Sequence, residues 1–195
     1  QAETGTSRTT TQHNAAPWDI TEQSQDNLHC LYYHAGSHLR TPTTKNLDLN
    51  ATQEVTSAAS VFAKLKGVSY LGNSNKSTSL LTTTVGLRHV GGAYPNLATA
   101  DGPAETFPIA RGVIGQADKS APTSKITTSS GSVTDTTSMS SGDFPDDEPL
   151  FLGTASQNGG FSSAVRIYSY LVLNRLLTGT EESDLIDELD DMTGT

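Results

Sequence analysis

The 195-residue sequence has one cysteine, Cys30, few aromatic residues and few basic residues. A single cysteine excludes a fold that depends on internal disulfides. The 12 Lys and Arg residues are outnumbered by 21 Asp and Glu, and the net charge is −9. Such a surface repels phosphate groups, which argues against nucleic acid and anionic membranes as partners. No apolar run approaches the length of about 18 residues that a membrane-spanning helix needs.

Small polar residues are abundant, in contrast to the scarce cysteine, aromatic and basic residues. Ser and Thr together make up about a quarter of the chain, alongside 17 Gly, and these residues favour sheets and turns over helices. Only 34% of the residues are hydrophobic and 17% are charged. The composition predicts a mostly β protein with polar loops. The length suits one domain, residues 38–195, preceded by an arm or first strands over residues 1–37.

Short β-rich runs separated by Gly, Pro, Asn and Ser clusters predict an antiparallel sandwich. Residues 118–143 are almost all small and polar; they allow a hairpin of strands 126–128 and 133–137 around Ser130-Gly131, and disorder is the alternative. Polar loops are expected over 69–79 and 91–103. The strands are expected over 28–33, 55–65, 80–88, 149–153 and 164–173.

A helix is expected near the C-terminus, over 181–190. Thr180 is positioned to cap it, with acidic residues near its positive end. Its apolar face is formed by Leu185, Ile186 and Leu189. The acidic residues are expected on its solvated face, and Asp190-Asp191 opposes the helix dipole, which predicts fraying there. These acidic residues are Glu181, Glu182, Asp184, Asp187, Glu188, Asp190 and Asp191.

The C-terminal region has a recognisable order of elements. The strand PLFLG (149–153) and a Gly-rich turn precede RIYSYLVLNRLLTGTEESDLI (166–186). This segment resembles the end of laminin-G-like, concanavalin A-like domains, in which a Thr and a Glu, here Thr178 and Glu181, open a short helix. Residues 47–65 and 132–153 resemble the versions in phage and prophage proteins. The resemblance covers about residues 38–190 and implies a jelly-roll β-sandwich with a short C-terminal helix; no functional residue transfers with it.

The residues that catalysis would need are not arranged for it. Glycosidases on this scaffold need two carboxylates on one strand face, and no strand-like run has them. There is also no G-x-S-x-G elbow, so the chain is predicted to be non-enzymatic. The loop around Pro145 and up to Pro149 is acidic, and it is either a solvated turn or a calcium site, with calcium as the one candidate cofactor. Its members are Asp143, Asp146, Asp147 and Glu148.

Two aromatic residues are candidates for binding partners. Tyr94 precedes Pro95 in a Gly-rich loop and is the best candidate to stack on a sugar ring, although core or interface packing is the alternative for each aromatic. Trp18 and Ile20 are the large hydrophobic residues of the N-terminal arm. A rigid aromatic anchors well, so Trp18 is expected to insert into the sandwich edge or into a neighbouring subunit.

These observations lead to two functional hypotheses. The first is a non-enzymatic virion structural protein of a bacteriophage, a capsid-decorating, head-fibre or tail-associated subunit. Its partners would be other virion proteins or copies of itself, and a cell-surface glycan where it attaches to a host. The alternative is a secreted, extracellular bacterial lectin or carbohydrate-binding module.

Overall fold

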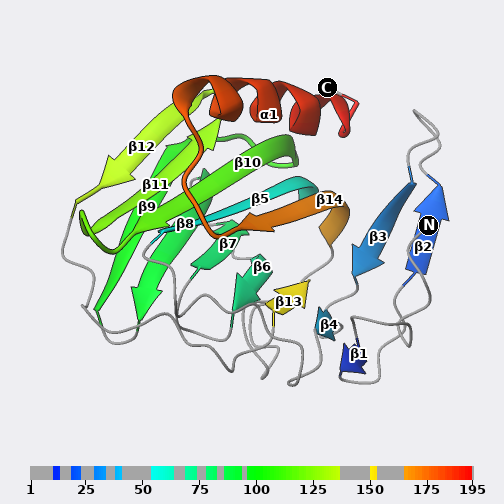
Figure 1. The fold of residues 1–195 in the computed structure, drawn as a ribbon. Helices are drawn as coiled ribbons and strands as arrows, with labels where there is room; N and C mark the ends of the chain where they lie inside the picture. The colour runs from blue at the N-terminus through cyan, green and yellow to red at the C-terminus, as the bar shows by residue number, and fades with distance from the viewer. Residues whose placement is uncertain are drawn as a thin grey trace.

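The computed structural model describes the backbone of residues 11–13, 19–22, 29–33, 38–40, 54–63, 69–73, 78–82, 86–93, 96–136, 150–152 and 165–194. Side chains are described for residues 54–62, 80, 87–89, 98–136 and 166–194. The described residues form two antiparallel β-sheets and one helix, α1 (Gly179–Asp191), which lies on the outer side of one sheet (Figure 1). The predicted β-sandwich with a short C-terminal helix is confirmed.

Each sheet has seven strands within the described residues. The first sheet has the order β1 (Thr11–His13), β4 (His38–Arg40), β13 (Leu150–Leu152), β6 (Ser69–Asn73), β7 (Thr78–Thr82), β8 (Gly86–Ala93) and β9 (Asn96–Ala104). The second sheet has the order β12 (Gly131–Asp135), β11 (Thr123–Thr128), β10 (Ile109–Asp118), β5 (Glu54–Ala63), β14 (Val165–Leu173), β3 (His29–Tyr33) and β2 (Asp19–Glu22).

Strands from the first 37 residues take part in both sheets. β2 and β3 pair with each other at one edge of the second sheet, where Leu31 of β3 lies opposite Ile167 of β14. β1 pairs with β4 at an edge of the first sheet. Whether residues 1–37 act as a separate docking arm stays a prediction.

The core between the sheets is built from alternating residues of β5 and β10. Val55 and Ala117 form a buried cluster with Ala98 of β9, and Val172 packs against it. Because side chains alternate along a strand, the intervening residues of β5 and β10 point to the other face of the second sheet, away from the first sheet. That second face forms another apolar layer.

The second apolar layer lies between the second sheet and α1. Ala58 and Ile114 from the sheet contact Ile186 and Leu189 of the helix, and Leu171, Leu177 and Leu185 pack around them. The predicted apolar face of the helix is therefore confirmed. Two polar contacts also hold the helix: the Ser60 hydroxyl donates to Leu189 O at 2.6 Å, and Gly112 N donates to Asp190 Oδ1.

One strand prediction and two loop predictions are wrong, because segments rich in small and polar residues pair with neighbouring strands in the sheet. The single strand predicted over 80–88 is two antiparallel strands, β7 and β8. The residues between them, 83–85, are Thr-Thr-Val with no Gly or Pro, and Gly86 begins β8. β6 and the first residues of β7 occupy the expected loop 69–79, with β13 and β7 on either side of β6. β8 and β9 cover most of the expected loop 91–103. In all three segments, hydrogen bonding to neighbouring strands outweighs the weak local preference of the residues for other structure.

The hairpin predicted within 118–143 is confirmed, with a shifted turn. Thr128 lies opposite Gly131, so the two turn residues are Ser129 and Ser130, not Ser130-Gly131. Gly131 has φ of 134°, a conformation that residues with a Cβ rarely adopt. The disorder considered for this region does not apply to residues 118–136, which are ordered strands and turns.

The helix begins two residues earlier than the sequence predicted. Its N-cap is Thr178, not Thr180: the Thr178 hydroxyl accepts from Glu181 N, and the Glu181 carboxylate accepts from Thr178 N. This reciprocal pair is a capping box, and it uses the Thr and Glu that the laminin-G resemblance indicated. The helix also continues through Asp190 to Asp191, because the Asp190 carboxylate is held by Gly112 N.

Candidate functional site

A small pocket lined by polar and apolar residues lies on the outer face of the second sheet, where the chain crosses from β14 into α1. Its volume is about 210 Å³. Three strands and the start of the helix surround it. The lining residues are Gln116, Asp118, Thr123, Lys125, Thr134, Leu176, Leu177 and Glu182.

The register of the hairpin brings the pocket residues together. Gln116 and Asp118 of β10 lie opposite Lys125 and Thr123 of β11, and Lys125 lies opposite Thr134 of β12. Directly opposed residues in an antiparallel pair point to the same face. The same three strands therefore present one patch of polar side chains toward α1.

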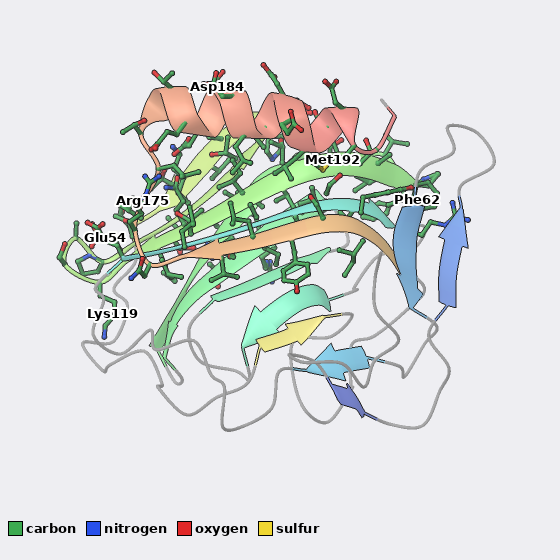
Figure 2. All side chains as sticks on the ribbon, turned by 45° about the vertical axis from the view of Figure 1, so that its right-hand side comes forward. Glu54, Phe62, Lys119, Arg175, Asp184 and Met192 are labelled. Atoms are coloured by element: carbon green, nitrogen blue, oxygen red, sulfur yellow. The ribbon has the colours of Figure 1, made fainter. Side chains whose placement is uncertain are left out.

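The segment before the helix closes one side of the pocket. The Thr56 hydroxyl donates to Arg175 O at 2.6 Å, and Leu176 N donates to Glu54 Oε2 at 3.4 Å. Figure 2 shows Glu54 and Arg175 at the same edge of the molecule, below the start of α1. These contacts fix the path of Leu176 and Leu177, which supply the apolar wall.

Glu182 lines the pocket from α1 and is 8% exposed. Lys125 Nζ donates to both of its carboxylate oxygens at 2.6 Å, and the Thr127 hydroxyl donates to Oε2 at 3.3 Å. With the Gln116 amide nitrogen turned toward Glu182, Gln116 donates to Oε1 and accepts from Leu177 N at 2.8 Å. The buried carboxylate is thus fully engaged, which is the condition for burying a charge without a large penalty.

The rim has polar atoms that remain open. Asp118 Oδ1 accepts from Ser120 N, the Ser120 hydroxyl and Ala121 N, at 2.6 to 3.2 Å. Its Oδ2 and the hydroxyls of Thr123 and Thr134 make no hydrogen bond with any residue that the structure describes. These atoms are available to a ligand.

The start of α1 is stabilised by a charged pair outside the pocket. The Arg175 guanidinium donates to both oxygens of Glu181 at 2.8 Å. This contact and the bond from Thr178 N lower the pKa of Glu181 to about 2, and the same pair raises the pKa of Arg175. Both side chains are close to half exposed, so the pair orients the helix start and adds little to stability.

The free groups of the pocket are suited to binding a polar molecule. Glycoside hydrolysis uses two free carboxyl groups across the scissile bond. Glu182 is occupied by Lys125 and Gln116, which leaves the Asp118 carboxylate as the one with a free oxygen among the lining residues. Open hydroxyls, one carboxylate oxygen and an apolar wall are instead the groups that hold a polar small molecule in place.

The sequence pattern does not by itself indicate this pocket. The expectation that all the acidic residues of the helix lie on its solvated face is wrong for Glu182, which is buried, and for Asp190, whose carboxylate accepts from Gly112 N. Helical spacing contained the signal, because Glu182 precedes Leu185, Ile186 and Leu189 by three, four and seven residues and must share their face. Asp184, in contrast, points away from the sheet as predicted (Figure 2).

The predicted binding residues lie outside the part of the chain that the structure describes. They are Tyr94, Trp18, Asp143, Asp146, Asp147 and Glu148. Tyr94 falls between β8 and β9, and Trp18 directly precedes β2. Within the described residues, no group of three or more His, Cys, Asp or Glu is placed to hold a metal ion. The calcium site therefore stays a prediction.

Comparison with known proteins extends the description of the fold. No protein-family model and no curated protein matches the chain. A botulinum neurotoxin serotype C1 binding domain has a TM-score of 0.66 at 7% identity, over 92% of this chain and 47% of that one. The binding domain of botulinum neurotoxin DC, solved in complex with SialylT, has a TM-score of 0.65 at 5% identity, over 92% and 46%.

A third similar structure is a single domain of about the same size. Domain 4 of an extracellular arabinanase from Geobacillus stearothermophilus, solved with arabinotriose, has a TM-score of 0.60 at 9% identity, over 91% of this chain and 87% of that one. The present chain thus spans about half of the neurotoxin binding domains and most of the arabinanase domain. At these identities the likeness establishes a shared β-sandwich fold. The described residues include no helix long and apolar enough to span a membrane.

Proposed function

We propose that this chain is a non-catalytic domain that binds glycans. The observation that carries the proposal is the match to domain 4 of the arabinanase, which covers 91% of this chain and was solved with arabinotriose bound. The neurotoxin neighbours support it, since one was solved with SialylT, and cell entry of botulinum neurotoxin type C is dependent upon interaction with two ganglioside molecules. The pocket beside α1 offers free hydroxyl and carboxylate oxygens, which hydroxylated ligands use.

A glycan array tests this proposal directly. The whole chain is screened against neutral plant-type oligosaccharides, including arabinotriose, and against sialylated and ganglioside-type glycans, and each signal is followed by calorimetry. We expect saturable binding to one glycan class with micromolar to millimolar affinity, which is the range expected of a single small site. A flat response across the array, from a chain that unfolds cooperatively, would contradict the proposal.

For the biological setting we propose a bacteriophage particle, where the domain would bind other virion proteins or copies of itself and contact the host surface. What supports this setting is the resemblance of residues 47–65 and 132–153 to phage and prophage domains. The secreted lectin is the alternative setting for the same binding activity. Mass spectrometry of purified particles decides between them, because absence of the chain from virions would remove the first.

A further inference from the structure

We propose that the pocket between the β10–β12 strands and the start of α1 is a subsite for one neutral sugar ring. This inference rests on the glycan-binding function proposed above and names the site and the chemical class. The volume of about 210 Å³ is below that of pockets for drug-sized ligands. It fits a single ring, and the rest of an oligosaccharide would extend into solvent.

The open groups match the chemistry of a sugar. A sugar hydroxyl both donates and accepts, so it needs an acceptor and a donor within hydrogen-bond distance. Asp118 Oδ2 accepts, and the hydroxyls of Thr123 and Thr134 do either. Lys125 uses its ammonium on Glu182 but has three N–H groups in all, so one remains for the ligand. Leu176 and Leu177 offer an apolar wall for the C–H face of the ring.

The charges of the pocket favour a neutral sugar over an acidic one. The Lys125 charge is balanced by Glu182 at 2.6 Å, and Asp118 remains, so the lining residues carry a net charge of about −1. A sugar carboxylate would meet Asp118 without a free guanidinium to bind it. The net charge of −9 on the whole chain acts in the same direction.

The site is held in shape before any ligand arrives. Hydrogen-bonded pairing of β10, β11 and β12 fixes the backbone under the rim. Glu182 is tied to Lys125, Thr127 and Gln116, and the three bonds to Oδ1 orient the Asp118 carboxylate. Little side-chain ordering is then needed on binding, which favours measurable affinity from few contacts.

The test is an NMR titration of the whole isotope-labelled chain with arabinotriose and, separately, with a sialylated trisaccharide. Two variants remove rim groups without touching Glu182: Thr134→Val replaces a hydroxyl by a methyl, and Asp118→Asn keeps an acceptor for the Ser120 turn but loses the carboxylate. The matched control is Thr136→Val, an exposed threonine just beyond β12 that does not line the pocket. Tyr94→Ala tests the competing site.

We expect the neutral trisaccharide to shift the amide signals of residues 116–125 and 134. Thr134→Val and Asp118→Asn should each raise Kd about three- to tenfold, as loss of one or two hydrogen bonds does, while Thr136→Val leaves Kd unchanged. Binding that is lost in Tyr94→Ala and kept in both rim variants would overturn the pocket but leave the proposed function standing. Tighter binding of the sialylated sugar to the pocket would overturn the neutral-sugar assignment. No binding of any sugar would overturn both.

Discussion

His89 is a histidine inside the core between the two sheets. It is fully buried, and its Nδ1 lies 2.9 Å from the Ser124 hydroxyl of β11. Burial lowers its pKa to about 3 from the ordinary 6.5, so the ring is neutral in the folded protein. The ring lies against β10 at Gly115, where a Cβ would overlap the His89 ring and come within 2.8 Å of Leu80 Cδ2. The imidazole thus takes the space of the missing side chain.

Gly115→Ala should destabilise the protein by about 1–3 kcal/mol, because an added methyl in a filled core forces its neighbours apart. Gly179→Ala is the matched control, since nothing lies within 4 Å of its added Cβ and alanine favours helix, for a gain of up to about 1 kcal/mol. Urea unfolding followed by circular dichroism measures both. Equal stability of Gly115→Ala and the native chain would show that His89 and Leu80 have room to move.

The buried His89 also predicts how stability depends on pH. The unfolded chain takes up a proton on this ring as pH falls below 6.5, whereas the folded chain resists it down to about 3. The stabilisation is complete above pH 6.5 and is lost as pH falls through this window, by up to about 1.4 kcal/mol per pH unit. His89→Asn should unfold with a shallower pH slope between pH 6 and 4. Carboxylates contribute to both proteins equally, so identical slopes would contradict the assignment.

Among the elements, α1 is held by contacts that differ along its length. Its first turn is fixed by the capping box of Thr178 and Glu181 and by the buried carboxylate of Glu182, and its end is fixed by Asp190 against Gly112 N. Ile186 and Leu189 fill the gap above the second sheet. The helix is therefore a third layer of the sandwich.

Thr178→Ala should lower stability by about 1 kcal/mol, because it leaves Glu181 N without its acceptor at the helix start. Thr180→Ala, two residues later, should cost nothing, since Thr180 is exposed within the first turn and alanine has the higher helix propensity. Thermal unfolding of the two variants side by side distinguishes the two N-cap assignments. The reverse order of stabilities would restore Thr180 as the cap.

At the scale of the whole molecule, the fold depends on α1. Ile186 and Leu189 are 5% and 3% exposed, and full burial of two such side chains contributes about 3–6 kcal/mol. That is comparable to the total stability of a domain, about 5–15 kcal/mol. Deleting residues 178–195 should abolish cooperative unfolding and produce strong binding of a hydrophobic dye. Removal of residues 194–195, beyond the helix, should change neither measurement; a stable, dye-free chain without α1 would contradict this role.

The sequence predicted the layers more reliably than the connections. Alternation and β-branched residues located β5, β14 and the β11–β12 hairpin, and helical spacing located the buried face of α1. β6 and β9 were missed because β6 contains Gly and Asn, and β9 also contains Ala, Asp and Pro, all of which have low strand propensity. Their side chains carry too little hydrophobic periodicity to indicate a strand alone.

The sequence by itself determined the class of the fold, the absence of internal disulfides, the acidic surface and the capped C-terminal helix, because composition, cysteine count, charge and short-range spacing are local properties. Only the tertiary structure decided the candidate site. Gln116, Lys125, Thr134 and Glu182 are up to 66 residues apart, the separation of the first and last. Strand register and helix docking bring them together, and neither is visible in the local pattern of any one segment.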